Sequence, residues 1–98
     1  MKPTRIEISQ VIGDYLSGSK TKKEVSEWAI GVLSREVFTV DELLLEDALT
    51  ALTGLHDEDE RWDTAKEDLE FFKECLDGQK PYPSRIEVFP EKAAKRGP

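Results

Sequence analysis

The sequence has little of the chemistry that metal and redox sites need. It contains one cysteine and one histidine among 98 residues. The lone Cys75 cannot form an internal disulfide, and a free cysteine in an amphipathic helical segment is usually a small buried hydrophobe. Zinc sites need several Cys or His ligands at fixed spacing, and neither C-x-x-C nor H-E-x-x-H occurs. We therefore expect no metal site and no cofactor.

Catalytic and phosphate-binding motifs are also absent. No serine lies in a nucleophile elbow, and the six glycines are scattered, so no loop is built to hold a phosphate. His56 falls at an expected junction between helices, where an exposed or capping role is the favoured interpretation. We expect a protein without catalytic residues. An enzyme that uses His56 together with nearby carboxylates is the least favoured alternative.

Long apolar runs are missing. No segment approaches the roughly 18 apolar residues that a membrane-spanning helix needs. The residues from Met1 to Arg5 lead into amphipathic sequence and not into a secretory apolar stretch. These features predict a cytoplasmic protein that makes no contact with a membrane.

Acidic residues are abundant and concentrated in the middle of the chain. The net charge of −7 divides into +1 for residues 1–40, −11 for residues 41–77 and +3 for residues 78–98. The middle region has three basic and fourteen acidic side chains. Such a field repels phosphate backbones and attracts cationic surfaces. We therefore expect a protein partner with a basic surface and no direct binding of nucleic acid.

Four amphipathic segments carry clear helix start and stop signals. Three capping boxes, each a threonine followed three residues later by a glutamate, predict helix starts: Thr4 with Glu7, Thr21 with Glu24, and Thr39 with Glu42. Glycines at positions 18, 54 and 78 predict helix ends. A fourth helix is expected to start within residues 57–60, because acidic side chains stabilise a first turn, and to run through Trp62 and Ala65 to Leu76.

These signals predict an all-α fold, a compact bundle of four helices over residues 1–78. Four prolines and several basic residues follow, so residues 79–98 are expected to form an extended basic tail. Within the tail, residues 84–89 alternate apolar and polar side chains and echo residues 4–8. A tail that lies extended on the bundle is favoured, and a short two-stranded β-ribbon is the alternative.

A dense group of carboxylates is the candidate surface for binding a partner. The predicted binding residues are seven carboxylates and one aromatic anchor in the tail: Asp57, Glu58, Asp59, Glu60, Asp63, Glu67, Glu70 and Tyr82. Glu46 and Asp47 on the preceding helix are possible neighbours. A solvated acidic face is the alternative interpretation. The aspartates at 57, 59 and 63 imitate part of a calcium loop, but its Gly and bidentate Glu are missing.

Two tryptophans have helical spacing that is typical of core positions. Trp62 is spaced with Ala65 and Leu69, and Trp28 with Val25 and Val32. Both are expected to contribute to the core, with Trp62 the more ambiguous of the two. Tyr82, which is flanked by prolines, is the better candidate for an exposed anchor.

Four stretches, between about residues 12 and 77, resemble a family of small bacterial helical proteins. They are Leu16-Ser17-Gly18, residues 21–29 (TKKEVSEWA), residues 48–54 (ALTALTG) and residues 68–76 (DLEFFKECL). Some members of that family are immunity proteins of contact-dependent growth inhibition or other polymorphic toxin systems. The chain departs from the pattern at Phe72 and Cys75, where the family has Trp-Leu spacing, and in its longer proline-rich tail. The resemblance implies a helical immunity protein but assigns no functional residue.

The leading hypothesis is an immunity protein that binds and neutralises a basic toxin domain through its acidic surface. A regulatory or scaffold adaptor with a non-toxin protein partner is the alternative. Both hypotheses describe a binding protein, and they differ in what the partner does.

Overall fold

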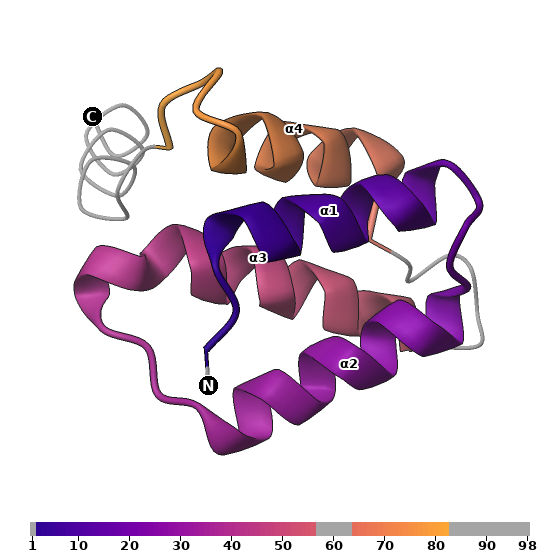
Figure 1. Cartoon of the computed structure of the whole chain (residues 1–98), viewed down its shortest axis with the longest axis horizontal. Helices are drawn as coiled ribbons and strands as arrows, with labels where there is room; N and C mark the ends of the chain where they lie inside the picture. The colour runs from indigo at the N-terminus through magenta and orange to yellow at the C-terminus, as the bar shows by residue number, and fades with distance from the viewer. Residues whose placement is uncertain (1, 57–63, 83–98) are drawn as a thin grey trace, which may run out of the picture.

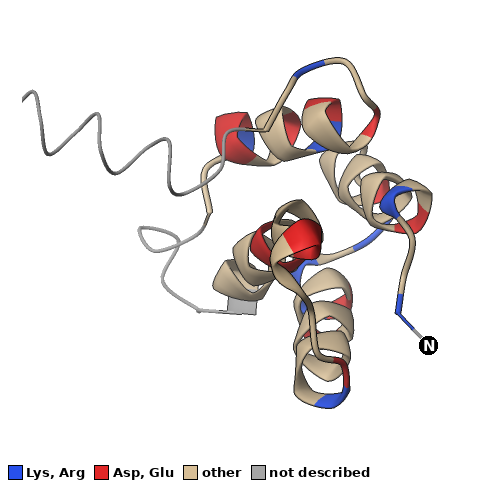
Figure 2. Ribbon diagram, turned by 90° about the vertical axis from the view of Figure 1, so that its left-hand side faces the viewer, with Lys and Arg blue, Asp and Glu red and all other residues tan. Residues whose placement is uncertain are grey.

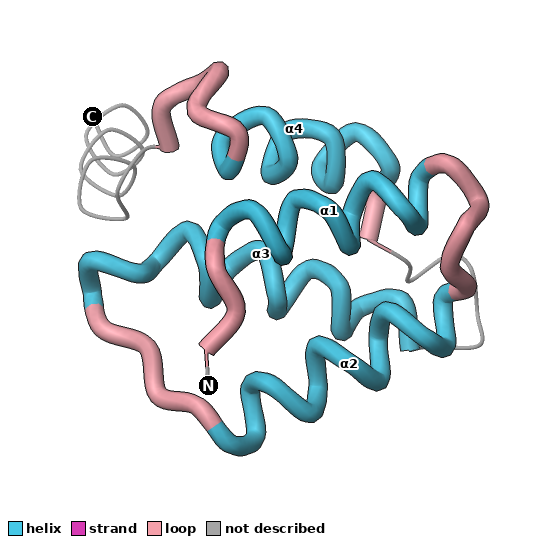
Figure 3. The backbone as a smooth tube through the Cα atoms, viewed as in Figure 1, coloured by secondary structure: helices cyan, strands magenta, loops and turns pink. Residues whose placement is uncertain are grey.

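The computed structural model describes residues 2–56 and 64–82 and confirms the expected all-α bundle of four helices. The helices are α1 (Arg5–Leu16), α2 (Lys22–Arg35), α3 (Leu43–Thr53) and α4 (Lys66–Leu76). Two short 3₁₀ turns, η1 (Val40–Glu42) and η2 (Gly54–His56), flank α3. Consecutive helices run in opposite directions, with α1 beside α4 and α2 beside α3 (Figure 1). None of the described residues forms a strand (Figure 3).

The first two helices begin at the predicted capping boxes. The Thr4 hydroxyl accepts the Glu7 backbone N–H at 3.1 Å, and the Glu7 carboxylate accepts the Thr4 N–H at 2.8 Å. Thr21 and Glu24 repeat the same pair of hydrogen bonds with the same distances. These bonds satisfy backbone donors that a helix leaves unpaired in its first turn.

The third box caps a 3₁₀ turn and not the α-helix directly. The Glu42 carboxylate accepts the Thr39 N–H at 2.9 Å, while the Glu42 N–H donates to the Thr39 carbonyl. The second bond spans three residues, which is the 3₁₀ pattern, and α3 then begins at Leu43. The predicted start signal is therefore confirmed, with one tight turn ahead of the helix.

The fourth helix begins later than expected. Ala65, predicted to lie inside the helix, is the residue before its first turn and has an extended backbone, with ψ at 145°. Thr64 also lies outside the helix, and its hydroxyl donates to the Ala51 carbonyl of α3. This tertiary hydrogen bond directs Thr64 toward α3, so the α-helix starts at Lys66. Residues 57–63, where the start was predicted, lie outside the described residues, as does Trp62.

The helix-ending glycines behave in two different ways. Gly18 and Gly78 have positive φ angles of 89° and 83°, the left-handed conformation that glycine adopts without strain. Gly54 ends α3 as expected, but with φ at −63° it continues into η2. Its lack of a side chain matters for another reason, because a Cβ there would lie 2.5 Å from the Thr64 hydroxyl oxygen.

The core lies between the four helices and is made of the apolar positions that the helical spacing predicts. The fully buried side chains come from all four helices and include Ile8, Ile12, Val25, Val32, Leu49, Leu52 and Leu69. Trp28 is only half-buried, with part of its surface packed on the core. The predicted core contribution of Trp28 is therefore partial.

The ribbon alternative is wrong at its N-terminal strand. Residues 5–8, which would form that strand, are the first turn of α1. Their capping box and the buried Ile8 stabilise a helix, so they have no extended backbone to offer a partner strand. Residues 83–98, the rest of the predicted tail, lie outside the described residues.

Candidate interaction surface

The exposed side of α4 carries the described part of the predicted acidic surface. Glu67, Asp68 and Glu70 are all exposed there. Figure 2 shows acidic residues along α4 and at the start of α3. Asp57, Glu58, Asp59, Glu60 and Asp63, the other predicted carboxylates, lie outside the described residues. The structure thus places two of the predicted carboxylates, Glu67 and Glu70, on one helix.

The carboxylates of this region fall into two groups. Some have a cation nearby: Glu42 lies 2.8 Å from Lys2, Asp77 lies 3.0 Å from Lys73, and Glu74 lies 3.0 Å from Lys80. By contrast, Glu67, Asp68 and Glu70 form no ion pair with another residue in the described part of the chain. The first half of α4 therefore presents charge that no ion pair within residues 2–56 and 64–82 neutralises.

An aromatic ring lies within the acidic side of α4. Phe71 follows Glu67 by one helical turn and precedes Glu74 by slightly less than one turn, so these three side chains share a face of the helix. Phe71 and Phe72 are half-buried, with ring centroids 6.1 Å apart. We call the face formed by Glu67, Glu70, Phe71 and Glu74 the outer face of α4. The i, i+4 and i+7 spacing of Glu67, Phe71 and Glu74 can be read directly from the sequence.

Residues 79–82, which we call the strap, turn back over the end of α4. The left-handed Gly78 reverses the chain, and the Gln79 N–H donates to the Glu74 carbonyl at 2.9 Å. Tyr82, predicted as an exposed anchor, is half-buried, and its ring centroid lies 6.2 Å from that of Phe71 and 5.9 Å from that of Phe72. Its hydroxyl donates to the Asp47 carboxylate of α3. The structure thus brings Tyr82 and Asp47 into contact.

A polar network joins α1 to the C-terminal end of α4. The buried Ser9 hydroxyl donates to the Asp77 carboxylate, and the Lys73 amine donates to both Ser9 and Asp77, at 3.2 and 3.0 Å. Gly13 leaves room for the Lys73 side chain, because a Cβ there would lie 3.0 Å from the Lys73 Cε. The network fastens α1 to α4.

This network lowers the pKa of Asp77 below its ordinary value of 3.8, through the hydrogen bond from Ser9 first and that from Lys73 second. The folded state therefore holds this proton less tightly than the unfolded chain. The resulting stabilisation is present above the ordinary pKa and is lost as the pH falls through the folded-state pKa. We expect Asp77→Asn to reduce the loss of stability between pH 5 and about pH 2.

Urea unfolding at several pH values measures this effect. Glu27→Gln, which changes an exposed carboxylate of α2, is the matched control and should keep the pH dependence of the unmodified chain. An Asp77→Asn variant with an unchanged pH dependence would show that the Ser9–Asp77–Lys73 network contributes nothing to folding.

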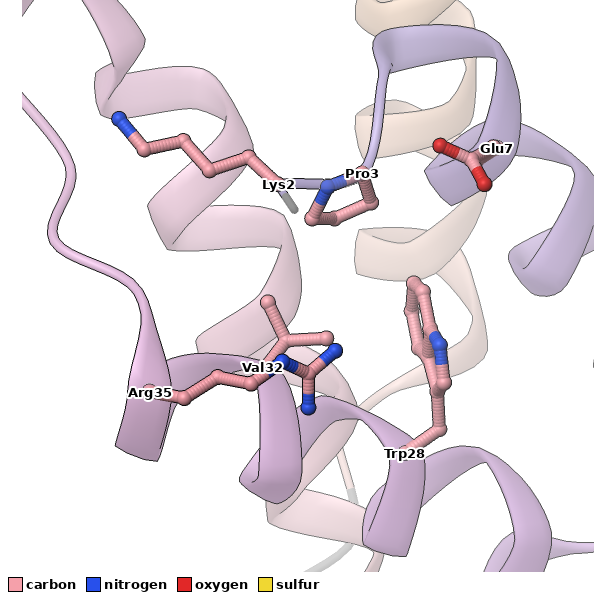
Figure 4. Close-up of a pocket in the computed structure, with 6 residues that line it drawn as sticks. All are labelled: Lys2, Pro3, Glu7, Trp28, Val32 and Arg35. Carbon is pink, nitrogen blue, oxygen red and sulfur yellow. The ribbon is translucent and has the colours of Figure 1, made fainter.

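A hollow lies between the N-terminal segment and α2. It has a volume of about 120 Å³ and is lined by Lys2, Pro3, Glu7, Trp28, Val32 and Arg35. Trp28, Val32 and Arg35 come from α2, and the Lys2 side chain extends away from Trp28 (Figure 4). The Lys2 amine instead contacts Glu42 and lies 5.2 Å from the centre of the Phe38 ring. One cation of the hollow, Lys2, is therefore already engaged by η1 and by the connection that precedes it.

The described residues contain no group of three or more His, Cys, Asp or Glu side chains that could hold a metal ion. Cys75 is buried, its pKa is raised by that burial, and its thiol lies 3.8 Å from the Pro81 carbonyl of the strap. No helix in residues 2–56 and 64–82 has the length and apolar character to cross a membrane.

Comparison of the chain with protein-family models, with curated proteins and with solved structures found no match.

Proposed function

We propose that this protein is an immunity protein that binds a basic toxin domain and neutralises it by covering its active cleft. One observation carries the proposal: Glu67, Asp68 and Glu70 are exposed on α4 without an ion pair among the described residues, while their neighbours Glu74 and Asp77 have one. Unneutralised charge of one sign steers a partner of opposite charge and raises the association rate.

The division of charge along the chain supports the same proposal. Residues 41–77 carry a net charge of −11, and α4 with the start of α3 presents the described part of it on the surface. Toxin domains that act on nucleic acid carry basic clefts, because those clefts contact phosphates. An acidic helix that occupies such a cleft blocks access by its bulk and matches its charge. Binding alone is sufficient, so this function requires no catalytic residue.

Co-purification from the native host, with mass spectrometry of the bound protein, identifies the partner. Glu70→Lys should then raise the dissociation constant about tenfold at low salt, mainly through a slower association rate. The matched control is Glu27→Lys, which makes the same charge change on α2 and should leave affinity nearly unchanged. Equal affinities for the two variants would reject α4 as the binding surface. A partner with no toxic activity when it is expressed alone would reject the immunity function.

A regulatory or scaffold adaptor is the second candidate function, and a separate observation favours it. Three large apolar side chains are highly exposed away from α4: Ile6 at 79%, Val37 at 82% and Val40 at 89%. They lie on the N-terminal part of α1 and on the connection between α2 and α3. Exposed apolar side chains are common at protein interfaces, and a scaffold uses more than one surface. A non-toxic partner that is lost on Val40→Asp substitution would favour this function.

A further inference from the structure

The strap places a cation and an aromatic ring on the acidic and aromatic side of α4. The Lys80 amine lies 3.0 Å from a Glu74 carboxylate oxygen and 5.9 Å from the centre of the Phe71 ring. Two residues further on, the Tyr82 ring packs beside Phe71 and Phe72. The outer face of α4 thus already binds a short segment whose chemistry is that of a basic partner.

The ion pair and the ring contacts of the strap are of kinds that another segment can replace, and a tyrosine of that segment can also replace the hydrogen bond from Tyr82 to Asp47. Lys80 and Glu74 keep 52% and 41% of their side-chain surface exposed, and exposed ion pairs contribute little to stability. The aromatic contacts are offset ring pairs, which depend on the ring and not on the chain that carries it. Such surface segments open locally without unfolding the whole domain.

The first half of the outer face remains open beside the strap. Lys80 reaches Glu74, but Glu70 and Glu67, about one and two turns earlier on α4, form no ion pair with a described residue. A longer basic segment would therefore make the contacts of Lys80 and Tyr82 and add ion pairs that the strap does not make.

We propose that the outer face of α4 is a binding site for a segment with a cation and an aromatic side chain two residues apart, and that the strap occupies it as an intramolecular competitor. A protein partner binds there by displacing Lys80 and Tyr82. The identity of that partner rests on the proposed function, whereas the competition rests on the contacts of the strap. The strap then lowers the apparent affinity in proportion to the fraction of molecules in which it is closed.

Labelling of Cys75 with a thiol reagent measures strap opening in the full chain. Cys75 is the only cysteine, is 1% exposed and lies against Pro81 of the strap. The double substitution Lys80→Ala with Tyr82→Ala should raise the labelling rate about tenfold, which corresponds to about 1.4 kcal/mol of opening free energy. Lys66→Ala, an exposed lysine at the other end of α4, is the matched control and should leave the rate unchanged. An unchanged rate in the double variant would overturn the proposal.

A peptide added in trans separates competition from general loss of stability. The probe is an acetylated Gly-Gln-Lys-Pro-Tyr peptide, the sequence of residues 78–82. It should return the labelling rate of the double variant toward that of the unmodified chain, which a destabilised fold would not do. A peptide with Glu in place of Lys should fail, and the probe should not protect a triple variant that also carries Phe71→Ala. Equal protection by the two peptides would refute a specific site.

The affinity for a purified partner distinguishes competition by the strap from direct binding through Tyr82. Once a partner has been purified, Tyr82→Ala should tighten its binding about threefold to tenfold if the strap competes, and weaken it if Tyr82 is itself an anchor in the complex. Weaker binding would overturn this inference and leave the immunity function standing. Peptide protection together with a partner that is not a toxin would reject the immunity function and leave the competing strap standing.

Discussion

Substituting Leu49 by alanine should lower the free energy of unfolding by about 3 to 5 kcal/mol. Leu49 is fully buried in α3, the helix that contacts α1, α2 and α4. The substitution removes buried methyl groups and leaves a cavity that surrounding helices fill only partly. Single domains of this size are stable by about 5 to 15 kcal/mol, so one such change removes a large part of the total.

Urea unfolding followed by circular dichroism measures the Leu49 effect through the midpoint at an unchanged slope. Thr50→Ala is the matched control, since Thr50 is the next residue of α3 and is exposed. Its hydroxyl bonds only to the Glu46 carbonyl of its own helix, so we expect a change within about 0.5 kcal/mol. A loss below about 1 kcal/mol for Leu49→Ala would mean that α3 does not occupy the centre of the core.

Substituting Gly54 by alanine should destabilise the protein by about 1 to 3 kcal/mol. The new Cβ would lie 2.5 Å from the Thr64 hydroxyl oxygen, closer than real Cβ contacts allow. Thr64 must then move and lose its hydrogen bond to the Ala51 carbonyl. The loss of folding free energy combines overpacking with a broken hydrogen bond. It exceeds the small gain in stability that alanine brings by restricting the conformations of the unfolded chain.

A double-mutant cycle isolates this contact. In a Thr64→Ala background the hydroxyl is gone, so Gly54→Ala should cost far less than it does in the unmodified chain. Urea unfolding of the four proteins gives the coupling energy. If Gly54→Ala lowers the free energy of unfolding equally in both backgrounds, the Thr64 hydroxyl is not the reason that position 54 requires glycine.

The local sequence determined most of the helical architecture. Capping at Thr4 and Thr21 depends on residues three positions apart, so these two helix starts can be read from the local sequence. The same holds for the left-handed turns at Gly18 and Gly78, because only the absence of a side chain is needed. Buried positions such as Ile12 and Val32 follow from the helical period of apolar residues.

The tertiary structure decided where α4 begins and how its surface is arranged. Thr64 bonds to Ala51, thirteen residues earlier, and no local pattern around Ala65 announces that bond. Likewise, the contact of Tyr82 with Asp47 joins residues thirty-five positions apart. The sequence alone predicted the acidity of α4 and proposed Tyr82 as an anchor, because charge and residue type are local properties. The position of Lys80 and Tyr82 over Phe71 depends on the chain reversal at Gly78 and on the packing of α4 against α3. Only the folded structure determines how these two features combine.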